Sequence, residues 1–293
     1  MKNRPTFLII YLLSAAAVSC IVRYVQLIGD VIDFNTGFFY PHTGFMRYLH
    51  YIVLGVALAG IIVLAIIEKH RKTRFFTKKM GHFDDGDTAI CGIMLLMTGF
   101  AVIYTAVMSG LGGIAPLQLV AVLLGVAGYG FAGVVLLRYR RVYPSVGMVF
   151  LLLSGFYVLR MMELFLSNYI ILSMSEHLIR LVQMALFALF YLSAGRIFLR
   201  AEMKSTRVKA CIFGFFTAVV SVSEITAKMI FWLGSMPVRR PAAESRFIAP
   251  DMLMAAETVA LLTILICMTR YKTKKAKTTV GEAAVIESET NGE

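Results

Sequence analysis

Charged residues are scarce in this 293-residue chain: Asp, Glu, Lys and Arg make up 16% of it, against 59% hydrophobic residues. The mean hydropathy of +0.77 lies outside the usual range of soluble globular domains. Apolar stretches recur from Thr6 to Arg270, and most are about 20 residues long, which is the length of helix that spans the hydrocarbon of a bilayer. The lack of charge therefore excludes a soluble domain and predicts an all-α, multi-pass integral membrane protein.

The predicted membrane domain is a bundle of eight transmembrane helices. The expected helices are Thr6 to Ile28, Met46 to Ile67, Thr88 to Ser109, Leu117 to Leu137, Pro144 to Leu166, Glu176 to Leu199, Val208 to Gly234 and Asp251 to Thr269. Lys and Arg collect at one set of helix ends, so the positive-inside rule puts the N- and C-termini in the cytoplasm. We expect a multi-pass cell membrane protein of a bacterial plasma membrane. Membrane lipids, and no nucleic acid, are the expected partners of the basic loops.

A weak internal repeat, at an offset of about 133 residues, divides the predicted bundle into two halves. Arg23-Tyr-Val-Gln26 corresponds to Arg160-Met-Met-Glu163 at the ends of the first and fifth helices. Four helices return the chain to its starting side, so the halves, residues 1–137 and 138–272, would be parallel repeats. Residues 273–293 form a polar cytoplasmic tail with too little apolar content to fold alone.

Cysteine is also scarce, and none of the four cysteines has a CxxC spacing or lies in an outer loop. This excludes a disulfide framework and a cysteine metal site. An alternative concerns the first helix: a basic start, an apolar middle and a small-residue end could make Cys20 the acylated residue of a cleaved lipoprotein signal. The apolar run continues past Cys20 through Ile21, Val22 and Val25, so we expect an uncleaved helix.

Catalytic motifs are missing as well. The chain has no nucleophile elbow and no HExxH pattern, so the sequence gives no positive signal for an enzyme. We predict no catalytic residue, no metal and no cofactor. A GxGxxG pattern at Gly128–Gly133 lies inside a predicted membrane helix with no strand before it. It is therefore interpreted as a small-residue face for close helix packing and not as a dinucleotide site.

The few charges inside the helices gather toward the predicted outer half of the membrane. A charge at the bilayer centre costs roughly 2.5–3.5 kcal/mol on insertion scales, so charges kept there usually pair or line water. Several share one helix face, such as Glu224 with Lys228 and Arg180 with Gln183. The candidate ligand-binding residues are Arg23, Gln26, His50, Arg160, Glu163, Arg180, Gln183, Glu224, Lys228 and Glu257.

Two interpretations of these residues stay open. In a sensor, scaffold or accessory subunit they would be structural ion pairs within one helix: Glu224 with Lys228, Arg160 with Glu163, and Arg180 with Glu176. In a small-solute transporter or solute-binding membrane subunit, four basic groups facing three buried acids would line a chamber that favours an anionic solute. Such a subunit could work with an unidentified membrane partner. A third hypothesis is an enzyme that acts on lipid headgroups.

One stretch resembles a known family. Glu224-Ile-Thr-Ala-Lys228-Met-Ile-Phe231 is similar to the acid-x-Ser/Thr-Ala-Lys-x-x-Phe segment in the last helix of the microbial rhodopsins. The resemblance implies that Lys228 carries retinal as a Schiff base and that Glu224 is a nearby counter-ion. The match covers eight residues; the predicted third helix has no carboxylate, an eighth helix follows, and Trp232 is the only tryptophan. A Glu224–Lys228 ion pair is the competing interpretation.

The predicted outer loop from Gly29 to Phe45 is rich in aromatic residues, including Phe34, Phe38 and Phe39. Aromatic side chains favour the headgroup level of a bilayer. We therefore expect an ordered interfacial cap here, which would serve, together with the loop that holds Arg239 and Arg240, as a lid over any chamber.

Overall fold

The structure is a computed structural model, which describes residues 4–29, 31–32, 39–40, 43–70, 85–108, 116–139, 144–167, 176–199, 205–235 and 251–269. These residues form helices and one isolated β-bridge. The helices are α1 (Arg4–Ile28), α2 (Met46–His70), α3 (Asp85–Met108), α4 (Pro116–Tyr139), α5 (Pro144–Ser167), α6 (Glu176–Phe198), α7 (Thr206–Ser235) and α9 (Met252–Thr269). Each end lies within three residues of its predicted position.

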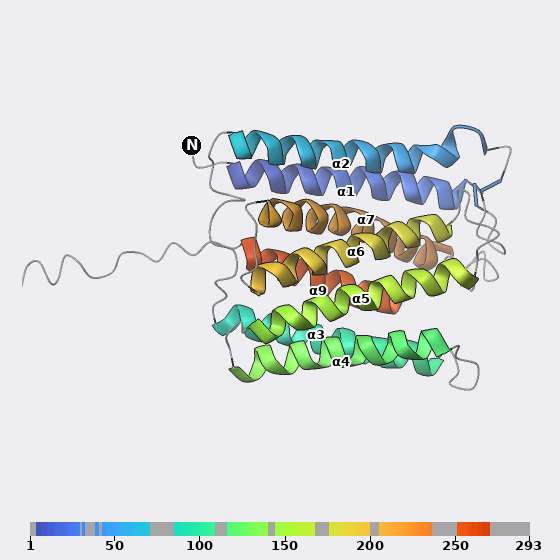
Figure 1. The fold of residues 1–293 in the computed structure, drawn as a ribbon. Helices are drawn as coiled ribbons and strands as arrows, with labels where there is room; N and C mark the ends of the chain where they lie inside the picture. The colour runs from blue at the N-terminus through green and yellow to red at the C-terminus, as the bar shows by residue number, and fades with distance from the viewer. Residues whose placement is uncertain are drawn as a thin grey trace, which may run out of the picture.

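Seven of these helices are long and apolar enough to cross a membrane, which confirms a multi-pass helical membrane protein. The remaining one, α9, is an apolar helix of 18 residues. It lies among the other helices of the bundle and contacts α3 and α7 along its length (Figure 1). The polar tail at 273–293 lies outside the described residues, and the two four-helix repeats stay a prediction.

Of the helices in the described residues, six form a closed ring, and the other two form a hairpin outside it. Contacts run from α3 through α4, α5, α6, α7 and α9 back to α3. The α1–α2 hairpin packs against α7 (Figure 1). Because consecutive helices run in opposite directions, α1, α3, α5 and α7 end where α2, α4, α6 and α9 begin. We call this the distal end of the bundle; α1 begins at the opposite end.

Aromatic side chains fill the ring beside α4, α5 and α6. The Tyr157 ring stacks on Phe187 and Tyr191, with centroid distances of 4.9 and 5.6 Å. The Tyr129 and Tyr157 hydroxyls share a hydrogen bond of 2.5 Å. All four side chains are fully buried. In a bilayer, helices associate through van der Waals packing and buried hydrogen bonds, and this aromatic layer supplies both.

Pairs of glycines bring neighbouring helices into backbone contact. A Cβ added at Gly92 of α3 would lie 2.9 Å from the Gly133 carbonyl oxygen of α4, and a Cβ at Gly133 would lie 2.9 Å from the Gly92 oxygen. Gly147 and Gly195 repeat this reciprocal contact between α5 and α6. The predicted small-residue face on α4 is therefore a packing face, although a Cβ at Gly130 would meet nothing within 4 Å.

The described parts of the loop after α1 cover the distal ends of α1 and α7. Ile32 and Phe39 form the β-bridge, and the Phe39 ring contacts Tyr51 of α2 edge to face at 6.3 Å. The two bridge residues share a buried apolar cluster with Leu27, Val31, Ala227 and Phe231. This part of the loop caps the junction of the hairpin and α7, in line with the predicted cap. Phe34, Phe38, Arg239 and Arg240 lie outside the described residues.

The first helix contains Cys20, the residue of the lipoprotein alternative. α1 continues through Cys20 to Ile28, and the Cys20 side chain is half-buried and free. Cys91, Cys211 and Cys267 are buried inside helices, as expected for small packing residues. Cleavage before Cys20 stays an alternative prediction.

Candidate functional site

The predicted site residues lie near the distal end, and nine of them fall into two groups. The hairpin cluster lies between the α1–α2 hairpin and α7; it consists of Arg23, Gln26, His50, Glu224 and Lys228. The ring cluster lies around the start of α9; it consists of Arg160, Glu163, Arg180, Glu257 and, in addition to the predicted residues, Asp251. The tenth residue, Gln183, is buried on α6.

Glu224 is the centre of the hairpin cluster. Arg23 donates from Nε to Oε2 of Glu224 at 2.9 Å and from Nη2 to Oε1 at 3.2 Å, a two-pronged contact that suits a carboxylate. Lys228, one turn along α7, places Nζ 2.9 Å from Oε1 of Glu224. The structure thus shows the predicted Glu224–Lys228 pair and adds Arg23 of the first helix to it.

Polar side chains extend this cluster along α1. Arg23 donates from Nη1 to Oε1 of Gln26 at 3.1 Å, and Gln26 donates to the Met46 carbonyl at the start of α2 at 2.6 Å. Ser19, one turn below Arg23, donates to Ser223 of α7 at 3.1 Å. These bonds explain why one polar face of an otherwise apolar α1 turns away from lipid. They join α1 to both of its neighbours.

His50 completes the hairpin cluster from α2. Its side chain is fully buried beside Arg23 and Glu224, and it interacts with the Ser19 backbone, but neither ring nitrogen makes a well-aligned hydrogen bond within the described structure. The Nε2 of Gln183 and the hydroxyl of Ser221 share this property. Buried polar groups are nearly always bonded to protein, water or a ligand, so these atoms mark places where a further polar molecule would be stabilised.

Lys228 is the residue to which the resemblance to the microbial rhodopsins assigns retinal. Its Nζ contacts Glu224, one turn away on α7. Ala227 and Phe231 of the same helix belong to the buried cluster that contains Leu27 of α1 and Ile32. The ion pair of the competing interpretation is present, and retinal binding stays a prediction.

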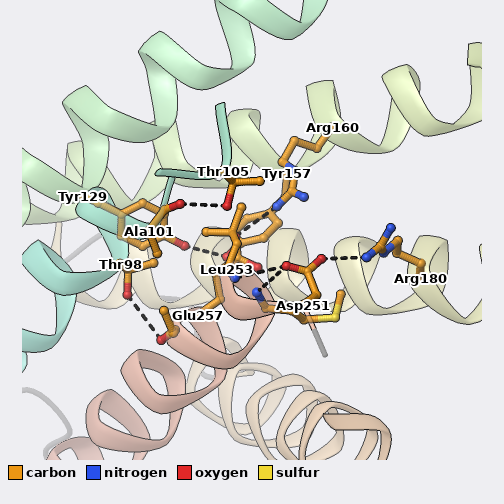
Figure 2. Close-up of polar contacts among 12 residues, drawn as sticks. Thr98, Ala101, Thr105, Tyr129, Tyr157, Arg160, Arg180, Asp251, Leu253 and Glu257 are labelled. Carbon is orange, nitrogen blue, oxygen red and sulfur yellow. Dashed lines mark hydrogen bonds and ion pairs between the residues drawn. The ribbon is translucent and has the colours of Figure 1, made fainter. Parts of the chain in front are cut away.

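The ring cluster contains two ion pairs between helices. Arg160 of α5 donates from Nη1 to Oε1 of Glu257 at 3.1 Å, and Arg180 of α6 donates from Nη2 to Oδ2 of Asp251 at 2.6 Å (Figure 2). The predicted pairing of Arg160 with Glu163 on its own helix is wrong, because Arg160 reaches across the ring to α9. Arg180 pairs with Asp251, and the side chain of Glu176 lies outside the described residues.

Asp251 is a site residue that the sequence analysis assigned only to a helix start. Its Oδ1 accepts hydrogen bonds from the backbone N–H groups of Leu253 at 3.0 Å and Met254 at 3.2 Å (Figure 2). Asp is favoured at the N-cap, where its carboxylate bonds to these otherwise unpaired groups. An acid before a helix, at the same end of the bundle as two predicted arginines, was the signal that could have found it.

Asp251 should make stability depend on pH. Burial alone would raise the pKa of Asp251, but the guanidiniums of Arg180 and Arg160 and the two N–H groups outweigh it and hold this pKa below its ordinary value of 3.8. The stabilisation is therefore fully present above pH 3.8 and is lost as the pH falls through the lower, folded pKa. We expect Asp251→Ala to be about 1 kcal/mol less stable because the cap of α9 is lost. The variant should also lose part of the wild-type sensitivity to acid. Both effects are measured as the thermal unfolding midpoint between pH 6 and pH 3.

Asp251→Asn is the matched control for that experiment. It keeps an oxygen that can cap α9 but removes the charge that faces Arg180. Its unfolding midpoint at pH 6 should lie between those of wild type and Asp251→Ala, and its acid sensitivity should equal that of Asp251→Ala. Equal acid sensitivity in all three proteins would contradict the assignment.

A small pocket adjoins the ring cluster between α3, α4 and α5, and Leu253 of α9 also lines it. Its volume is about 80 Å³, and its polar lining consists of Thr105, Gln118, Arg160 and Glu163. One water needs roughly 10–15 Å³ of such volume, so the pocket has room for several waters. The Arg160 guanidinium lies over the Phe156 ring at 5.6 Å and forms part of the pocket wall. Thr105 and Gln118 were not among the predicted site residues, because single neutral polar residues in a membrane helix are common.

Comparisons with known proteins add no relative. The chain matches no family model, no curated protein and no solved structure. The function is therefore argued from the geometry of the two clusters and the pocket.

Proposed function

We propose that this protein is a small-solute transporter or solute-binding membrane subunit that favours anions, and that the hairpin cluster binds the anion. One observation carries the proposal: Arg23 and Lys228 share the carboxylate of Glu224. Among the described residues, this cluster therefore contains two cations and one acid. Asp251 brings the count over both clusters to four cations and four acids, so the surplus is local to the hairpin side.

Within the hairpin cluster, Lys228 is the residue suited to contact a solute. Arg23 is fully buried and held to Glu224 by two bonds, whereas the Lys228 side chain is 15% exposed and contacts one oxygen of Glu224. An ammonium group has three donors on a flexible stem and can turn toward an arriving carboxylate or phosphate. The bridge residues Ile32 and Phe39 lie over the junction and would have to move for a solute to enter or leave.

The orientation of the bundle in the membrane is part of the same proposal and is inferred from the positions of the basic residues. Arg138, Arg196, Arg207 and Lys209 lie at the end of the bundle where α1 begins. We propose that this end faces the cytoplasm of a bacterial plasma membrane, that α9 is an eighth crossing, and that the distal end faces outward.

A structural role is the second candidate, and the complete burial of Arg23 in the hairpin cluster favours it. Arg23 has no exposed surface, and its bonds join α1 to α7. In this case the protein would be a sensor, scaffold or accessory subunit, and no anion would change its stability.

Thermal unfolding of the purified protein in detergent separates these two functions. We expect sodium phosphate or sodium acetate, compared with sodium chloride at constant ionic strength, to raise the wild-type unfolding midpoint. A free anion concentration of 100 times Kd adds about 2.7 kcal/mol to the free energy of unfolding. Lys228→Gln should keep the Arg23–Glu224 contact and lose the response, and Lys209→Gln, near the other end of α7, should keep it.

Two results would count against the proposal. No anion response in wild-type protein favours the structural role, and an equal response in Lys228→Gln moves the anion to another site. If a response is found, uptake of the same labelled anion into liposomes that contain the purified protein would show transport and not binding alone.

A further inference from the structure

The ring cluster has more carboxylates than cations. Two arginines, Arg160 and Arg180, lie among three acids, Asp251, Glu163 and Glu257. Asp251 is compensated by Arg180 and by two backbone N–H groups. Among the described residues, one negative charge is therefore left over at membrane depth, where an uncompensated charge is costly and binding of one proton removes it.

Within the described residues, Glu257 is a fully buried carboxylate that makes one ion pair. It is 1% exposed, Arg160 donates to it at 3.1 Å, and Tyr157 also interacts with it. Glu224 is buried to the same degree, but it receives two bonds from Arg23 and one contact from Lys228. Two glutamates in similar surroundings thus differ in how firmly their charge is held.

We propose that Glu257 is a proton-binding site that is filled through the pocket between α3, α4 and α5, and that Arg160 turns from Glu257 to Glu163 when the proton binds. A proton from bulk solvent, carried by pocket water, forms an O–H bond on one carboxylate oxygen of Glu257, and nothing is oxidised or reduced. Use of this proton as the coupling ion of a carrier rests on the proposed function. Binding of the proton to Glu257 does not depend on that function.

Arg160 has a second acid within reach on its own helix. Glu163 follows it by three residues, a spacing at which side chains of a helix meet, and both residues line the pocket. The Arg160 side chain is 18% exposed, and Glu163 makes no hydrogen bond or ion pair to the described residues. Turning toward Glu163 would keep the guanidinium paired while Glu257 becomes neutral.

The groups around Glu257 are arranged to accept either state. Tyr157 of α5 interacts with the Glu257 carboxyl and is bonded to the Tyr129 hydroxyl of α4. A hydroxyl can donate to a carboxylate or accept from a carboxylic acid, so this tyrosine pair can adjust without losing its partner. Proton relays in membrane proteins use such rows of buried polar groups.

The helices packed around Glu257 place several charged and titratable groups near it. The charged and titratable groups that act on Glu257, or on which it acts, are Arg160 and Tyr157 of α5, Arg180 and Tyr191 of α6, Tyr129 of α4, and Asp251. From α3, the neutral Thr98 hydroxyl lies at 3.3 Å from the Ala256 carbonyl beside it. On α7, Glu224 and Lys228 hold each other and Arg23. Arg160 is thus the direct counter-charge.

Infrared difference spectroscopy of the purified protein, titrated with acid in the absence of any added organic or phosphate anion, tests the proposal. We expect a carbonyl stretching band of a buried carboxylic acid to appear as the pH falls, at pH values above those at which Asp251 and the exposed carboxylates gain protons, and to shift in D₂O. Glu257→Gln should lose this band. Glu163→Gln should show a weaker band at each pH, because Arg160 would have no second acid to pair with.

Fold and site assignment are controlled in the same samples. Glutamine is neutral and has nearly the same shape as glutamic acid, so Glu257→Gln should keep the wild-type helical circular dichroism and gel-filtration profile. A band that persists in folded Glu257→Gln, or the lack of any titrating band in wild-type protein, would overturn the proposal. Because no solute is present, such a failure is independent of the anion response of Lys228.

Discussion

Replacing Glu224 with alanine is expected to produce the largest loss of stability of any charge substitution in this protein. Glu224 is the carboxylate that holds both Arg23 and Lys228, and Arg23 has no exposed surface. Removing one partner of a buried ion pair costs about 3–5 kcal/mol, because the other charge stays buried without compensation. We expect Glu224→Ala to unfold at a much lower temperature in detergent, or to be recovered only in small amounts.

Glu163→Ala is the matched control for this prediction. Glu163 is a glutamate near the same end of the bundle, but it is half-buried and makes no ion pair within the described residues. Its replacement should change the free energy of unfolding by less than about 0.5 kcal/mol. If Glu224→Ala were as stable as Glu163→Ala, the pairing of α1 with α7 through Arg23 would be wrong.

Replacing Gly133 with valine is expected to have the second-largest effect. Even a single Cβ at Gly133 would lie 2.9 Å from the Gly92 carbonyl oxygen and 2.6 Å from Cγ of Leu96. Backbone cannot move aside as a flexible side chain does, so α3 and α4 would have to separate. Overpacking of this kind costs about 1–3 kcal/mol or more, which thermal unfolding of the purified variant would measure.

Gly130 provides the control on the same helix. A Cβ at Gly130 would meet nothing within 4 Å, so Gly130→Ala should leave the unfolding midpoint unchanged or raise it slightly, since alanine favours a helix. Gly133→Ala should already lower it. Equal effects at the two positions would mean that α3 and α4 are not in backbone contact at Gly133.

The helices were predictable because their ends depend on local sequence. Membrane thickness sets the length of an apolar run, and residues such as Pro144, at the start of α5, mark where a helix begins. The polar face of α1 was predictable for the same reason, since Arg23 and Gln26 are three residues apart. Local spacing also identified the Glu224–Lys228 pair.

Contacts between helices could not be predicted in this way. Arg160 and Glu257 are 97 residues apart, and Arg180 and Asp251 are 71 apart. The order of helices in a bundle depends on packing faces that are apolar throughout and therefore carry little information. Glu163 is the nearest acid to Arg160 in sequence, so helical spacing suggested it as a partner in the structural interpretation, but Arg160 contacts Glu257.

The separation of the hairpin from the ring has a consequence for how the protein is made. Arg23 precedes its partner Glu224 by 201 residues, and α7 is the ring helix against which α1 and α2 both pack. During synthesis α1 and α2 enter the bilayer long before α7 exists. Arg23 must then be accommodated by snorkelling or by local water until most of the chain has been translated. Docking of the hairpin is therefore a late step, and chains that stop after α6 should keep α1 as a poorly inserted helix that membrane quality control can recognise.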